Sequence, residues 1–135
     1  MTSTVIYKGE LRTELTHLQS GTVIENDAPS DNQGKGERFS PTDMLATSLG
    51  SCMITTMAIK ASDMKLNFAD TKIEVTKIMS TDAPRRVAGI KVDLYFTKDF
   101  IPTDDQKVLL EKIGRTCPVA KSLNTDIHQD IHFHW

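Results

Sequence analysis

Residues 39–64 constrain the fold more than any other stretch, because their pattern predicts one long, largely apolar helix with a cysteine near its middle. Ser40 supplies an N-cap side chain, Pro41 has the φ that suits a first helical position, and Asp43 completes an S-x-x-D capping box. Apolar side chains occur on nearly every side of this helix, namely Leu45, Ala46, Leu49, Met53, Ile54, Met57, Ala58 and Ile59. Such a helix is expected to be buried on more than one face.

Length and charge place the chain among ordinary globular proteins. Its 135 residues suit a single domain, residues 1–135, and its formal charge of -2 offers no basic surface for nucleic acid. The N-terminal residues lack the pattern of a signal peptide, and no apolar run reaches the ~20 residues of a membrane span. We therefore expect a cytoplasmic protein with no nucleic-acid partner and no membrane association.

The segments before the long helix are short and rich in β-branched residues. Strands are predicted over residues 3–8, 11–18 and 21–26, and the Gly-containing breaks between them favour an antiparallel meander. Residues 27–38 are polar and contain Gly and Pro, which is typical of a loop leading into the helix.

The segments after the long helix complete an α+β arrangement. Alternating residues predict a hairpin of strands over 68–80 and 86–98, and a T-x-x-Q capping box at Thr103 and Gln106 begins a helix over 104–114. Gly114 is expected to end this helix as its C′ residue. A short helix then follows, with Cys117 as N-cap and Pro118 as first residue, before a last strand over 126–134. The predicted order is βββ-α-ββ-α-α-β.

The two cysteines, Cys52 and Cys117, lie 65 positions apart, and a reducing compartment would keep them as thiols. A transient redox pair is one interpretation. Either cysteine taken alone is more often a small buried hydrophobe. Local structure favours Cys117 as the more acidic thiol, because the N-terminus of a helix lowers a thiol pKa, and Arg115 and Lys121 lie nearby in sequence. Cys52 would need a donor or a cation from another segment.

Three histidines, His128, His132 and His134, share one face of the last predicted strand with Asp130. Alternate residues on a strand can bind a metal, but a solvated outer face has the same pattern. We favour the solvated face and predict no metal site.

Two motifs together carry a family resemblance. SPTDMLATSLGSCM places a cysteine in an apolar helix nine residues after an acid, and CPVAKSL follows far downstream, before the last strand. In this order and over essentially the whole length, the chain resembles the OsmC/Ohr family, the osmotically inducible protein C and organic hydroperoxide resistance proteins. The OsmC-like branch is the closer of the two.

The resemblance implies an OsmC-like fold, with antiparallel sheets around the long helix in an intertwined homodimer. It also implies a thiol-dependent peroxidase for organic hydroperoxides, and for hydrogen peroxide as a further substrate. By this resemblance Cys52 attacks the peroxide and forms a sulfenic acid, and Cys117 resolves it to a disulfide. An external dithiol or small thiol then reduces the disulfide. No metal, prosthetic group or other cofactor is expected.

The first turn of the long helix departs from the peroxidase pattern. The hydroperoxide reductases of the family carry a Glu after an Asn-Pro, paired with an Arg, whereas here Thr42 occupies that position and the acid is Asp43. Arg38 and Arg12 are the candidates for the Arg. Nine helical residues advance ~13.5 Å and two and a half turns, so Asp43 cannot contact Cys52 of its own helix. We expect Asp43 to act across the dimer or by orienting an Arg.

Three hypotheses follow. The first is the two-cysteine peroxidase, with Cys52, Cys117, Asp43 and Arg38 as site residues. The second is an OsmC-like redox sensor, or a protein that binds small electrophiles or lipid-like ligands without efficient turnover. The third, a metal-binding protein that uses the terminal histidines, has the least support from the sequence.

Overall fold

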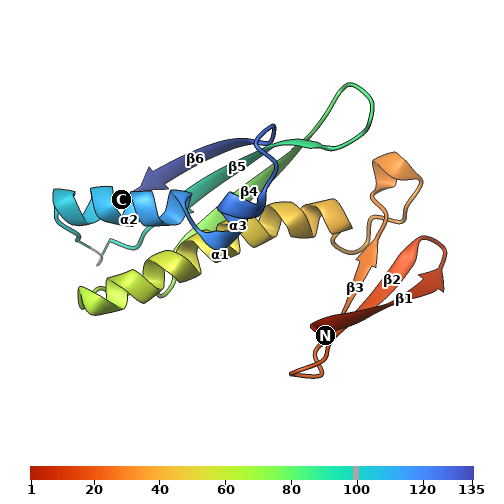
Figure 1. Ribbon diagram of the computed structural model, residues 1–135, viewed down its shortest axis with the longest axis horizontal. Coiled ribbons are helices and arrows are strands. Elements are labelled where there is room, and N and C mark those ends of the chain that lie inside the picture. Colours follow the sequence, from red (N-terminus) through yellow and green to blue (C-terminus); the bar gives the residue numbers. More distant parts are fainter. Residues whose placement is uncertain (99–100) are drawn as a thin grey trace. The chain divides into compact units, whose positions relative to one another are not determined.

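A computed structural model describes residues 1–98 and 101–135, which form two compact units, Met1–Leu45 and Ala46–Trp135. The element order, drawn in Figure 1, is the predicted βββ-α-ββ-α-α-β with one added 3-10 turn. The elements are β1 (Ser3–Gly9), β2 (Arg12–His17), β3 (Val23–Asp27), η1 (Ser30–Asn32), α1 (Pro41–Asp63), β4 (Lys72–Met79), β5 (Val87–Tyr95), α2 (Asp104–Arg115), α3 (Pro118–Ser122) and β6 (His128–His134). That the whole chain forms a single domain remains a prediction.

The first unit is built on the predicted antiparallel meander, in the order β1-β2-β3. Val5 of β1 lies opposite Leu15 of β2, which lies opposite Ile24 of β3, so the three form one apolar row across the sheet. The residues of this unit that are buried are all polar: Asn26, Asp27 and Ser40. Val5 and Tyr7 keep 60% and 64% of their surface exposed. This sheet therefore has apolar surface that its own unit does not cover.

A charge network joins the ends of this meander to the loop that follows. Arg12 donates two hydrogen bonds to Asp27, from Nε to Oδ1 at 2.7 Å and from Nη2 to Oδ2 at 2.8 Å. The same guanidinium binds Glu37 at 2.8 Å, and the Glu37 backbone N–H donates to Asp27 at 3.2 Å. The Arg12 hydrogen bonds hold the pKa of Asp27 below its ordinary value. The network thus fixes the loop of residues 27–38 to β2 and β3.

In the second unit, α1 covers one face of a three-stranded sheet (Figure 1). The strand order is β4-β5-β6, with β4 and β5 antiparallel as predicted. β5 and β6 are parallel, so the expectation of purely antiparallel sheets is wrong for this unit. The physical reason is the connection, because α2 and α3 lie between β5 and β6 and carry the chain back to the starting end of the sheet.

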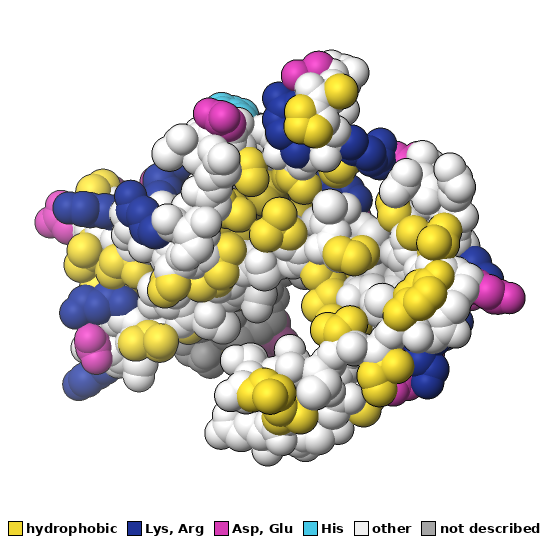
Figure 2. All heavy atoms as spheres, turned by 45° about the vertical axis from the view of Figure 1, so that its right-hand side comes forward, with side chains coloured by type: hydrophobic (Ala, Val, Ile, Leu, Met, Phe, Trp, Pro, Cys, Tyr) yellow, Lys and Arg dark blue, Asp and Glu magenta, His cyan; other side chains and the backbone are white. Residues whose placement is uncertain are grey.

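The buried side of α1 is a single stripe. Leu49, Met53, Met57 and Ala61 are fully buried at helical spacing, whereas Ile59 keeps 75% of its surface exposed. Within one chain, the expected burial on more than one face is not met, and Figure 2 shows hydrophobic side chains at the surface. By length and composition alone α1 could also span a membrane, but core helices of soluble proteins meet the same criteria.

Both predicted capping boxes are present. At α1 the Asp43 backbone N–H donates to Ser40 Oγ at 3.1 Å, and the Ser40 N–H donates to Asp43 Oδ2 at 2.8 Å. At α2 the reciprocal bonds join Thr103 and Gln106. These bonds satisfy backbone donors that a helix start would otherwise leave unpaired.

Gly114 does not end α2 as predicted. The helix continues through Arg115, and Gly114 is buried inside it. A Cβ added at Gly114 would lie 2.8 Å from the sulfur of Met57. This glycine therefore allows α2 to approach α1 closely, which is a packing role and not a left-handed helix stop.

Gly50 gives the first prediction. A Cβ at this position would lie 2.8 Å from Val75 Cγ2 and 3.0 Å from Ile73 Cγ2, and neither branched side chain can move far. We expect Gly50→Ala to lower the free energy of unfolding, because overpacking costs about 1–3 kcal/mol and outweighs a helix-propensity gain of about 1 kcal/mol. Urea unfolding followed by circular dichroism measures this. The exposed neighbour Ser51→Ala is the control, and equal stability of the Gly50→Ala variant and wild type would contradict the packing argument.

The Arg12–Asp27 pair gives a prediction on pH. Because the pKa of Asp27 is lowered in the folded protein, its contribution is complete above the ordinary carboxyl pKa of ~3.9 and is lost as pH falls through the folded value. We expect the stability difference between wild type and Asp27→Asn to shrink from pH 6 to pH 3. Urea unfolding across that range measures it, with the exposed Asp126→Asn as control. A stability difference that does not change with pH would refute the claim that the Asp27 carboxylate stabilises the fold through its lowered pKa.

Candidate functional site

Cys52 lies in the middle of α1, next to the buried stripe, and is half-buried. Its sulfur is 3.9 Å from the Thr56 hydroxyl oxygen, one turn later on the same side of the helix. That hydroxyl donates a hydrogen bond to the Cys52 carbonyl at 2.7 Å, which fixes the orientation of Thr56. α1 therefore presents the thiol on the edge of its packed face, where it is open to other elements of the unit.

Cys117 lies between α2 and α3 and is fully buried. As predicted, it is the N-cap of α3, with Pro118 as the first helical residue and extended backbone angles of φ -60° and ψ 156°. Its backbone N–H donates to Gly114 O at 3.2 Å, and its carbonyl accepts from Lys121 N at 3.1 Å. The end of α2 and the start of α3 thus hold this cysteine from both sides.

The fold brings the two thiols close enough for each to shift the pKa of the other, although they lie 65 residues apart in the chain. Both are free thiols in the structure. The first turn of α3 lies next to them, and its Val119 and Ala120 backbone groups act to lower the thiol pKa values, although Cys117 as N-cap makes no side-chain capping hydrogen bond. The described residues therefore contain a reduced thiol pair flanked by backbone donors.

The surroundings favour the thiolate at Cys52. Burial opposes ionisation, but the Val119 backbone, the Cys117 side chain and the Thr56 side chain together outweigh it and lower the pKa of Cys52. Donors stabilise a charged sulfur more than a neutral one. Of the two thiols, Cys52 is therefore the one whose pKa lies below its ordinary value.

Cys117 behaves in the opposite way. Burial raises its pKa, the Ala120 and Val119 N–H groups offset this only in part, and its hydrogen bond to Cys52 raises it further. The local prediction that Cys117 is the more acidic thiol is therefore wrong. The predicted helix start is present, but full burial and a neighbouring thiolate have the larger effects.

Asp43 is placed in the first turn of α1, where its carboxylate forms the capping box with Ser40. This is the structural role that the S-x-x-D pattern predicts. Thr42, at the position of the family's Glu, has its hydroxyl 3.1 Å from Ser40 Oγ. Both residues belong to the first unit, and a role for Asp43 at a thiolate stays a prediction.

The two candidate arginines also lie in the first unit, each paired with carboxylates. Arg12 binds Asp27 and Glu37 as described above. Arg38 donates from Nε to Glu25 Oε2 at 3.1 Å and from Nη1 to the Glu37 carbonyl at 3.1 Å. Whether Arg38 acts on Cys52 stays a prediction.

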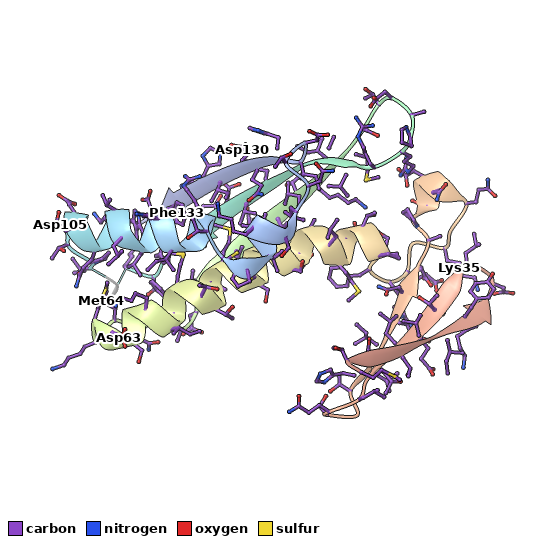
Figure 3. All side chains as sticks on the ribbon, in the orientation of Figure 1. Lys35, Asp63, Met64, Asp105, Asp130 and Phe133 are labelled. Atoms are coloured by element: carbon purple, nitrogen blue, oxygen red, sulfur yellow. The ribbon has the colours of Figure 1, made fainter. Side chains whose placement is uncertain are left out.

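Asp130, labelled in Figure 3, lies on the face of the second sheet away from α1, and the three histidines share its side of β6 because they alternate with the buried Ile131. His134 Nε2 is 2.9 Å from Asp93 Oδ1, and His132 Nε2 is 2.9 Å from Asp130 Oδ1. Among residues 1–98 and 101–135, no group of three or more His, Cys, Asp or Glu side chains is arranged to hold a metal ion. His132 and His134 instead each contact one carboxylate, and both histidines are exposed.

A hollow of about 350 Å³ lies at another part of the second unit. It is lined by Phe96, Thr97, Lys98, Ile101, Pro102, Lys107 and Trp135. Neither cysteine lines it, so this hollow is separate from the thiol pair.

Sequence reasoning missed the groups around the thiols. The sequence places Val119 in a short helix. It does not reveal that Val119 acts on Cys52, because that depends on how α3 packs against α1. Gln129 was also missed. Its Nε2 donates to the Ala120 carbonyl at 3.1 Å. A signal was present, since Gln129 is a polar residue on the same side of the last strand as Ile127, Ile131 and Phe133.

Comparisons with known proteins agree with this architecture. The OsmC-like protein family matches residues 34–132. A protein of Psychrobacter arcticus 273-4, described as an osmotic stress induced and detoxification response protein, is 50% identical, with a TM-score of 0.93 over 99% of this chain and 96% of that one. No match is found among curated proteins.

More distant solved structures share the fold. An OsmC-like protein of unknown function from Vibrio cholerae is 14% identical, with a TM-score of 0.77 over 96% of both chains. An organic hydroperoxide resistance protein OsmC from Legionella pneumophila is 12% identical, with a TM-score of 0.76 over 100% of this chain and 98% of that one. The family match covers most of the chain and includes both cysteines, so the chain belongs to the OsmC-like protein family.

Proposed function

We propose that this protein is a thiol-dependent peroxidase that reduces organic hydroperoxides, with hydrogen peroxide as a further substrate. The observation that carries the proposal is the proximity of Cys52 and Cys117, in which Cys52 has the lowered pKa. A thiolate is the nucleophile in such a reaction, and a second thiol within contact resolves the product.

The reaction begins at the Cys52 thiolate, which attacks the terminal oxygen of the hydroperoxide. The O–O bond breaks, the sulfur becomes a sulfenic acid, and the departing alkoxide takes a proton from water to leave as an alcohol. The Cys117 thiol then attacks the Cys52 sulfur, which releases water and forms the Cys52–Cys117 disulfide. A dithiol or small thiol reduces this disulfide through a mixed disulfide and restores both thiols.

The reaction uses only side chains of this chain and an external thiol, so the proposal includes no metal or prosthetic group. It places the protein in the cytoplasm, where both thiols start reduced. The proposed function involves no nucleic-acid partner and no membrane association. Asp43 and Arg38 remain proposed site residues, with Asp43 acting across a dimer or by orienting an arginine.

A second function is favoured by the carboxylate partners of the arginines. Arg12 binds Asp27 and Glu37, and Arg38 binds Glu25. Within the first unit, both arginines are therefore already paired with carboxylates. Thr42 also replaces the acid of the hydroperoxide reductases. This arrangement supports an OsmC-like redox sensor, or a binder of small electrophiles or lipid-like ligands, in which the thiols react once without efficient turnover.

Peroxide consumption separates the two functions. We expect wild type to consume cumene hydroperoxide over many cycles with dithiothreitol or dihydrolipoamide, and hydrogen peroxide more slowly. Cys117→Ser should keep the first turnover, because it retains the attacking thiol, whereas Cys52→Ser should lose it. Wild-type consumption no faster than Cys52→Ser would exclude the peroxidase. A single equivalent of peroxide consumed, with slow recycling, would favour the sensor.

We also propose that the protein is an intertwined homodimer. Burial in the first unit is confined to polar residues, while Val5, Tyr7 and Ile24 leave an apolar sheet face exposed. The exposed Ile59 adds apolar surface on α1. A three-stranded sheet needs its apolar face covered to be stable in water, and a second copy of this chain supplies a cover.

The dimer proposal has its own measurement. We expect sedimentation equilibrium at micromolar concentration to give twice the chain mass of 15.0 kDa. A Val5→Glu/Tyr7→Glu variant should sediment as a monomer or lose folded structure, because it places charge on the apolar row. The control is Lys8→Glu, an exposed change on the same strand. A wild-type monomer at these concentrations would contradict the proposal.

A further inference from the structure

The thiol pair depends on how firmly α3 is held, because α3 supplies the backbone donors. The backbone N–H of Val119, in the first turn of a helix only five residues long, is the backbone donor that lowers the pKa of Cys52. So short a helix has little stability of its own. Contacts from other elements must therefore hold it in place against α1.

Gln129 of β6 makes such a contact. Its side-chain Nε2 donates a part-buried hydrogen bond to the Ala120 carbonyl at 3.1 Å. Ala120 is itself buried in the core of the unit. The bond thus joins the first turn of α3 to a strand whose position is fixed by its parallel ladder with β5.

Arg115 makes a second connection from the same segment to β6. Its Nη2 donates to the Ile131 carbonyl at 3.0 Å, and its guanidinium lies 5.2 Å from the centre of the ring of Phe133, which Figure 3 labels on β6. One connection precedes Cys117 and the other follows it. Of the two, the Gln129 bond ends on the turn that carries the sulfur donors.

We propose that Gln129 is a positioning residue for the thiol pair, because its hydrogen bond to Ala120 holds the Val119 N–H against the sulfur of Cys52. It contacts neither sulfur and acts through the backbone of α3. The importance of Gln129 for catalysis rests on the proposed function. Its effect on Cys52 does not, and it can be measured without peroxide.

The consequence concerns the charge state of Cys52. When the Ala120 carbonyl loses its donor, the first turn of α3 shifts and the Val119 hydrogen bond to Cys52 weakens. The Cys52 thiolate then forms only at higher pH. A stabilising role alone would lower the free energy of unfolding and leave this charge state unchanged.

The experiment measures iodoacetamide alkylation of Cys52 against pH in the reduced protein. Trypsin separates the two thiols, since residues 39–60 carry Cys52 and residues 116–121 carry Cys117. Mass spectrometry then follows each one in the same sample. We expect the midpoint for Cys52 to rise by about half a pH unit or more in Gln129→Met, which keeps the length of the side chain and removes the donor.

Gln129→Glu is the second variant, because it keeps the shape and places an acceptor against the Ala120 carbonyl. We expect its midpoint for Cys52 to rise further than that of Gln129→Met. The matched control is Gln106→Met, which removes a glutamine hydrogen bond from the α2 capping box. It should lower the unfolding midpoint in urea and leave the Cys52 profile as in wild type.

An unchanged Cys52 profile in either folded Gln129 variant overturns the proposal, and so does an equal shift in Gln106→Met. Because no peroxide is used, the result is independent of the consumption assay. A shifted profile with no peroxide turnover would retain Gln129 as a positioning residue and reject the peroxidase. Normal peroxide turnover with an unshifted Cys52 profile would support the peroxidase and reject Gln129 as a positioning residue.

Discussion

The packing of α1 against the β4–β5–β6 sheet determines where Cys52 can lie. Gly50 allows the helix backbone to approach Val75 and Ile73, and Leu49 and Met53 fill the space on the same side. Cys52 is adjacent to this stripe, so its sulfur lies at the edge of the core instead of inside it or in open solvent. This intermediate position allows a thiol to receive hydrogen bonds from a second element and still keep an exposed side.

The acidity of the two thiols follows from environment more than from helix position. Cys117 has the helix start that usually lowers a thiol pKa, yet its burial and its neighbour raise it. Cys52 lies in mid-helix and has its pKa lowered by donors from another segment. Both thiols lie next to the same short helix, and the less buried one, Cys52, has the lowered pKa because desolvation is smaller there.

Much of the fold was predictable because it depends on local chemistry. Several signals depend only on residues that are close in sequence. They are the capping residues Ser40 and Thr103, the period-two alternation in β4 and β5, and Pro118 after Cys117. The family resemblance added the expectation that Cys52 and Cys117 act together, which spacing alone does not give. The predictions that were wrong depended on packing between distant elements: the role of Gly114, the parallel pairing of β5 with β6, and the acidity of Cys117. Gln129 was missed for a related reason, because a polar residue on an apolar strand face gains meaning only when its partner is known.

The parallel pairing of β5 with β6 also affects the order in which the thiol pair is assembled. β6 follows α3 in the chain, and both connections that hold the Cys117 segment, from Arg115 and from Gln129, end on that strand. During synthesis, Cys52 leaves the ribosome long before the strand that completes its surroundings. The two hydrogen bonds to β6 can form only after that strand has been made, so the segment that carries Cys117 is the last to be held in place. The surroundings of the two cysteines are therefore completed by the last strand of the chain.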